Sequence, residues 1–107
     1  MKISIILITL FISSCAIFSN KDTAGQFPIY GNWCGPNHPI KNTNPAPIDR
    51  TDLACQHHDK CYEEHGYLNS YCDETLVTEL KSFIPRNEIE EIARKAIITY
   101  FKNSPKL

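Results

Sequence analysis

The sequence predicts an all-α fold, a small and mostly helical domain held together by disulfides. Apolar residues recur at helical spacing through the C-terminal half of the chain, where we find no alternating strand pattern and no internal repeat. Five cysteines occur in 107 residues, a length that allows only a modest hydrophobic core. We therefore expect two antiparallel helices that carry the functional site, a loop before them and a C-terminal helix after them.

The N-terminal segment predicts export. A lysine at position 2 precedes an apolar run, residues 3–12, which is too short to cross a bilayer and is typical of a secretory signal. The residues that end in Cys15 resemble a bacterial lipobox, in which the chain is cut just before a cysteine that receives lipid. This interpretation assigns 1–14 to a lipoprotein signal peptide and predicts a protein anchored to the bacterial envelope. The alternative is an ordinary signal cut after Ala16, which would give a secreted protein.

Composition indicates where the folded domain begins and which classes of partner it should bind. Residues 15–26 are mostly polar and rich in small residues, as expected for a tether, so the folded domain should comprise residues 27–107. The chain has 11 basic and 12 acidic residues, and the signal segment takes one lysine with it. This balance gives no electrostatic reason to expect binding to nucleic acid, and we expect a monomer.

The first elements of the domain are a loop and a helix. The stretch from Phe27 to Pro47 contains five prolines and two glycines and has no regular period, so it reads as loop. Asp49 is a favourable N-cap, and the helix after it should run to about Glu64 before Gly66 ends it.

Two further helices are predicted downstream. The second covers 67–84, with Asn69 or Ser70 as the alternative start, and Pro85 terminates it. The third begins at a capping box formed by Asn87 and Glu90. Its apolar residues recur at helical spacing, and they are Ile89, Ile92, Ala96, Ile97, Tyr100 and Phe101.

Apart from Cys15, the cysteines form an even set that predicts two disulfides in an exported chain: Cys34, Cys55, Cys61 and Cys72. Cys55 and Cys61 would lie roughly 9 Å apart along one helix, too far for a disulfide, and two pairings remain. A turn at Gly66 would bring Cys61 beside Cys72. This favours Cys61–Cys72 together with Cys34–Cys55.

The candidate catalytic residues lie in 55–64, where His58 and Asp59 are adjacent and are flanked by two cysteines. A histidine can take a proton near neutral pH, and aspartate is a hard oxygen ligand. The helix motif Asp-x-x-Cys-x-x-His-Asp-x-Cys-Tyr runs without a gap from Asp52 to Tyr62. With the upstream segment 30–37 it resembles the secreted phospholipase A2 family, as a short, bacterial-lipoprotein-like member.

This resemblance implies a catalytic pair. His58 would be the general base that activates water for attack on the sn-2 ester of a glycerophospholipid, and Asp73 would orient its imidazole. Tyr62 matches the family tyrosine that hydrogen-bonds this aspartate. The products would be a lysophospholipid and a fatty acid, and the partner would be a phospholipid membrane surface.

The resemblance also implies a Ca²⁺ cofactor. The ligands would be the backbone carbonyls of Trp33, Gly35 and Asn37 and both carboxylate oxygens of Asp59. Asn37 stands where the family prefers glycine, and asparagine is the residue that best replaces glycine in a left-handed conformation. The family's Cys-Asp step matches Cys72 and Asp73, and its disulfides match the favoured pairing.

Three alternatives remain open from the sequence. One is a catalytically silent member of the fold that binds lipid or a protein, and another is a structural envelope lipoprotein. The third is a zinc site built on Cys55, His58 and Cys61. The segment 67–71 is too short for the β-hairpin found in some members of the family, so we expect that hairpin to be absent.

Overall fold

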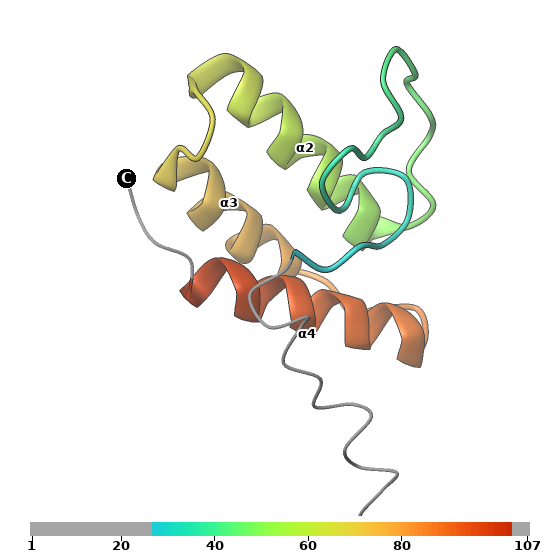
Figure 1. Ribbon diagram of the computed structural model, residues 1–107. Helices are drawn as coiled ribbons and strands as arrows, with labels where there is room; N and C mark the ends of the chain where they lie inside the picture. The colour runs from blue at the N-terminus through green and yellow to red at the C-terminus, as the bar shows by residue number, and fades with distance from the viewer. Residues whose placement is uncertain (1–26, 104–107) are drawn as a thin grey trace, which may run out of the picture.

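The computed structural model describes residues 27–103, which form three helices preceded by a long loop (Figure 1). The helices are α2 (Arg50–His65), α3 (Ser70–Leu80) and α4 (Glu88–Asn103). Within this described part there is no sheet, only an isolated bridge between Tyr30 and Cys34. The all-α prediction is confirmed. The predicted signal peptide 1–14, Cys15 and the tether 15–26 lie outside the described residues.

Helix α2 starts and ends where local signals predict. The Asp49 side chain accepts a hydrogen bond from the Asp52 amide at 2.8 Å and caps the first turn. At the other end Gly66 adopts φ 109°, and its amide donates to the Tyr62 carbonyl at 2.8 Å. A side chain at that φ would be strained, so glycine is the residue that ends this helix.

Helix α3 is shorter than predicted. Its start is capped by the Asn69 side chain, which accepts from the amides of Tyr71 and Cys72. The predicted end at position 84 is wrong, because the helix stops at Leu80. Beyond it the Ser82 amide and hydroxyl both donate to the Glu79 carbonyl, which tightens the chain into a turn.

Helix α4 begins with half of the predicted capping box. The Asn87 side chain accepts from the Glu90 amide at 2.9 Å, as a cap does. The Glu90 carboxylate does not return to Asn87. It accepts instead from the Arg86 amide at 2.8 Å and from Thr51 in α2, so the residue joins two helices.

The three helices enclose one core. Helices α2 and α3 run antiparallel and are linked by Gly66–Asn69 without a hairpin, while α4 lies across α3 (Figure 1). Core side chains come from all three helices, from the α3–α4 turn and from the loop: Trp33, Cys34, Ala54, Cys55, Leu76, Leu80, Phe83, Ile97 and Phe101. None of the described helices is long and apolar enough to cross a membrane.

Disulfides connect both halves of α2 to their neighbours. Cys34 in the loop is bonded to Cys55, and Cys61 is bonded to Cys72 of α3, with Cα atoms 5.2 and 5.7 Å apart. The loop and the two adjacent helices therefore form one cross-linked unit.

Candidate active site

His58 and Asp73 form a buried pair between α2 and α3. The imidazole Nε2 lies 2.8 Å from Asp73 Oδ1, and the two residues are 6% and 4% exposed. A carboxylate can only accept, so Nε2 carries the proton of the neutral ring. The other nitrogen, Nδ1, has no hydrogen-bond partner among the described residues. It remains available as an acceptor.

Aromatic rings surround this imidazole. Tyr62 lies 4.2 Å and Phe101 4.8 Å from it between ring centroids. Burial lowers the pKa of His58, and the hydrogen bond and charge of Asp73 only partly oppose this effect. The ring is therefore neutral at neutral pH, the form that can accept a proton.

Tyr62 holds the carboxylate of the pair. Its hydroxyl donates to Asp73 Oδ1, the same oxygen that accepts from His58. Burial, followed by the bond and charge of Asp73, raises the pKa of the Tyr62 hydroxyl far above its ordinary value, so it remains a donor. The sequence-predicted residues His58, Tyr62 and Asp73 thus lie in mutual contact.

Asp52 organises the loop that precedes α2. This carboxylate is fully buried and accepts from the amides of Asn32, Trp33 and Ile48 at 3.0, 2.8 and 2.9 Å. A Cβ on Gly31 would lie 2.5 Å from Asp52 Cγ, so only glycine allows this approach. The sequence places Asp52 in the helix motif but does not predict its role in holding the loop. Its place as the first residue of the helix motif was the available signal.

The same loop turns tightly after Trp33. Tyr30 and Cys34 exchange backbone hydrogen bonds of 3.0 and 3.1 Å, and Gly35 follows with φ 120°. Asn37 adopts φ 61°, the left-handed conformation that a glycine would favour. Asparagine therefore preserves the backbone geometry at this position.

Asp59 is a partly buried carboxyl group on the cavity that this loop also lines. It lines the same cavity as Trp33, Gly35 and Asn37, and no described residue donates to its carboxylate or pairs with it. Burial, followed by the charges of nearby acidic residues, raises its pKa to about 7. A bound cation would stabilise the charged carboxylate and so offset the cost of burying it. One carboxylate next to a carbonyl-rich loop is an oxygen donor set that fits calcium.

The zinc alternative fails for the described residues. Cys55 and Cys61 are both consumed in disulfides, so neither offers a thiolate. Within the range 27–103 no group of three or more histidine, cysteine, aspartate and glutamate side chains could hold a metal ion. A cation at this site would depend on backbone oxygens together with Asp59.

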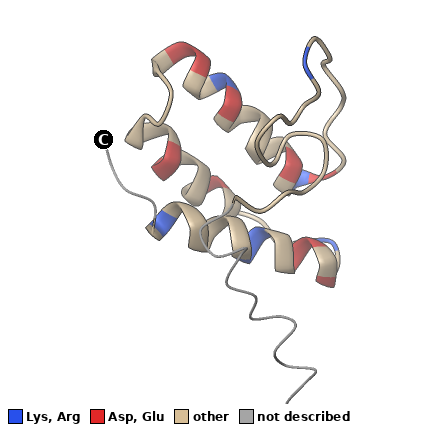
Figure 2. Cartoon of the chain, viewed as in Figure 1, with Lys and Arg blue, Asp and Glu red and all other residues tan. Residues whose placement is uncertain are grey.

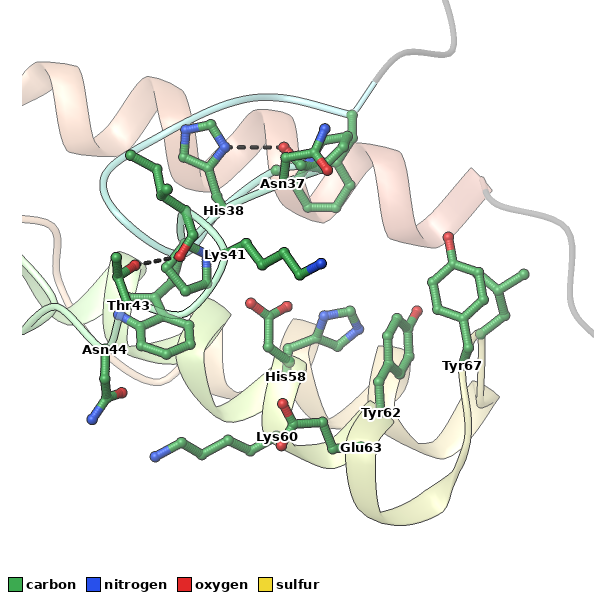
Figure 3. A pocket seen from close by; sticks show the side chains of 18 of the residues that line it. Asn37, His38, Lys41, Thr43, Asn44, His58, Lys60, Tyr62, Glu63 and Tyr67 are labelled. Atoms are coloured by element: carbon green, nitrogen blue, oxygen red, sulfur yellow. Dashed lines mark hydrogen bonds between the residues drawn. The ribbon is translucent and has the colours of Figure 1, made fainter.

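The pair and the loop open on a cavity of about 1170 Å³ (Figure 3). Six aromatic side chains line this cavity: Phe27, Trp33, Tyr62, Tyr67, Tyr100 and Phe101. Phe27 packs edge-on against Tyr100 and Phe101, with ring centroids 4.9 and 5.1 Å apart, so these three rings form an aromatic wall. This wall suits an apolar chain rather than a polar ligand.

Helix α4 contributes to the site in a way that the sequence did not predict. Phe101 touches the His58 ring, and both Tyr100 and Phe101 line the cavity. The apolar periodicity marked them as core residues but carried no information about which cavity they reach.

A family model described as Phospholipase A2 matches residues 9–99 of the chain, a span that includes the loop, α2, α3 and most of α4. No solved structure matches.

Proposed function

This chain belongs to the phospholipase A2 family, whose members are phospholipid-hydrolysing enzymes, and on that premise we propose that it releases the sn-2 fatty acid from glycerophospholipids with calcium as cofactor. The observation that carries the proposal is the buried His58–Asp73 pair, which leaves Nδ1 free on the cavity that Asp59 also lines. A base and a cation-binding carboxylate thus face one space.

His58 would take a proton from water as the oxygen attacks the ester carbonyl. The ring then becomes an imidazolium, and Asp73, at 2.8 Å from Nε2, stabilises that charge. Tyr62 keeps the carboxylate in place through its own hydrogen bond. The proton later passes to the leaving glycerol oxygen, which yields a lysophospholipid.

Asp59 and the carbonyls of Trp33, Gly35 and Asn37 would hold the calcium ion. Family members typically use Ca²⁺, and the bound ion supplies electrostatic stabilisation of the substrate phosphate and of the charge that develops on the carbonyl oxygen. The unpaired carboxylate of Asp59 and the left-handed backbone at Asn37 support this assignment.

The family acts at phospholipid surfaces, and the cavity mouth suits such a partner. Ile40 and Tyr67 line the cavity yet are 76% and 78% exposed, and Leu68, which also lines it, is exposed as well. Apolar side chains that are left in water around a site mark a surface for lipid or protein contact.

We propose the bacterial envelope as the location of the protein. Members of this disulfide-rich family are generally secreted. The lipobox-like sequence before Cys15 supports lipidation of that residue after removal of residues 1–14, with 15–26 as a tether for the catalytic domain. A secreted form cut after Ala16 is the alternative.

The test is fatty-acid release from mixed phospholipid vesicles, with calcium and with a calcium chelator. We expect release that depends on calcium, with the fatty acid coming from the sn-2 position. Binding to vesicles without any release would instead support the catalytically silent alternative.

A further inference from the structure

The loop that borders the cavity contains a tight turn formed by Ile40–Thr43. The Thr43 amide donates to the Ile40 carbonyl at 3.0 Å, and the Thr43 hydroxyl donates to the same oxygen. Asn42 adopts φ 65°, a conformation that asparagine tolerates. Lys41 is therefore presented at the tip of a defined turn.

The segment that follows this turn is hydrogen-bonded to the loop assigned to calcium. The Asn32 side chain donates to the Ala46 carbonyl at 2.9 Å, and the Trp33 indole donates to the Pro45 carbonyl at 2.9 Å. The backbone that carries Lys41 thus has a set position relative to the carbonyls next to Asp59.

Lys41 is the basic residue of the loop before α2 and lies on the cavity wall (Figure 2). Figure 3 shows its side chain extending from the loop into the cavity toward His58. No described residue forms an ion pair or a side-chain hydrogen bond with its ammonium group. Lys60 also lines the cavity, but its side chain points away from His58 (Figure 3).

The other charged groups that line the cavity are mainly carboxylates. Asp59, Glu63 and Asp73 all line the cavity, and their carboxylates would repel an anionic ligand. The calcium ion proposed at Asp59 would offset part of that repulsion. Lys41 supplies the other positive charge aimed into the space, on the side opposite α2.

We propose that Lys41 binds the phosphate of the phospholipid substrate and so selects phosphate-bearing lipids over neutral glycerides. The inference rests on the proposed function for the identity of the lipid. An ammonium group forms a charge-assisted hydrogen bond with a phosphate oxygen, which is stronger than a neutral one. The side chain is exposed in the free protein, so binding requires little desolvation.

The matched variants are Lys41→Gln and Lys60→Gln, which remove the same charge from two lysines of one cavity. Trp33 is the single tryptophan of the chain and lines the cavity, so its fluorescence reports binding directly. The ligand is a short-chain diether phosphatidylcholine, kept monomeric and resistant to hydrolysis, in the presence of calcium. We expect Lys41→Gln to raise Kd about tenfold, Lys60→Gln to stay within about twofold, and Lys41→Arg to bind nearly as wild type.

Two further ligands identify what the lysine recognises. A diether glycerol without phosphate should bind the wild type and Lys41→Gln equally. Inorganic phosphate should displace the lipid only weakly. If inorganic phosphate competes for the site at the same concentration as the diether phosphatidylcholine does, the site binds free phosphate and the lipid assignment is overturned.

The proposal fails if Lys41→Gln binds the phospholipid as tightly as wild type, or if both glutamine variants weaken binding equally. It also fails if the loss is the same for the phosphate-free ligand. These readouts do not require turnover. If the wild type binds in this pattern but releases no fatty acid, the proposed function is wrong and the assignment of Lys41 stands.

Discussion

Glu90 is a buried carboxylate that should contribute strongly to stability. It is 1% exposed, and it accepts from the Thr51 hydroxyl at 2.8 Å, the Thr51 amide at 3.2 Å and the Arg86 amide at 2.8 Å. Arg86 also reaches Asp49, the residue that caps α2. Glu90 therefore secures α4 to the first turn of the helix that carries His58.

Replacing Glu90 with alanine would remove all three hydrogen bonds and leave the Thr51 and Arg86 amides without this acceptor. Hydrogen bonds to a charged group contribute roughly 1.5–3 kcal/mol each, and bonds that share one carboxylate are not additive. We expect the free energy of unfolding to fall by about 3–5 kcal/mol, which is large for a single substitution.

The assay is denaturation by urea, followed through Trp33 fluorescence with the disulfides intact. Glu91→Ala is the matched control, since this neighbouring side chain forms surface pairs with Arg94 at 3.2 Å and Lys95 at 3.3 Å. Solvent screens such pairs, so they contribute little to stability. A loss below about 1 kcal/mol for Glu90→Ala, or equal losses in the two variants, would refute the reasoning.

Acid should reduce the contribution of Glu90. Burial acts to raise its pKa, but the hydrogen bonds from Arg86 and Thr51 outweigh burial and lower the pKa below its ordinary value. Its stabilisation is then complete above the unfolded pKa, about 4.3, and is lost as pH falls through the lower pKa of the folded state. The stability difference between wild type and Glu90→Gln should shrink below pH about 4. A difference that stays constant or widens there would contradict this account.

Three further predictions concern the site and the N-terminus. Asp59→Asn should weaken calcium binding sharply in a calcium titration, because an anionic ligand is lost, and full wild-type activity in a chelator would exclude the calcium assignment. His58→Gln should abolish turnover and keep calcium binding. His57→Gln, which removes an exposed side chain paired with Glu79, should leave turnover nearly unchanged. Equal losses of activity in the two variants would contradict the assignment of His58 as the base. Cys15→Ser should release soluble protein or block processing in a detergent-partition experiment. An unmodified mature chain that begins at Ile17 would instead favour the ordinary signal cut.

Local signals made part of the fold predictable. Asp49 and Gly66 act within a few residues of the ends of α2, so that helix could be placed from the sequence. The end of α3 could not, because Ser82 turns the chain by bonding back to Glu79, and Phe83 then packs into the core. Which of several compatible conformations a short segment adopts depends on what it packs against.

The site residues likewise include some that the sequence predicts and some that it does not. His58 and Asp59 follow from a continuous motif, but Asp73 was assigned through family resemblance, since no period links it to His58. Phe101 and Lys41 reach the cavity from segments far along the chain in either direction. Their places depend on tertiary packing, and a single sequence carries no signal of which remote side chains meet.

The two disulfides have a consequence for when the site becomes complete. Cys34–Cys55 bonds the loop assigned to calcium to α2, and Cys61–Cys72 bonds α2 to the helix that carries Asp73. If the protein is exported as proposed, it is synthesised in a reducing compartment, where the four cysteines remain thiols and neither disulfide exists. The loop and Asp73 would then be held to His58 by noncovalent contacts alone, in a domain with a modest core. Oxidation after export would thus act as an activation step, and the membranes of the producing cell would be protected from the enzyme during its synthesis.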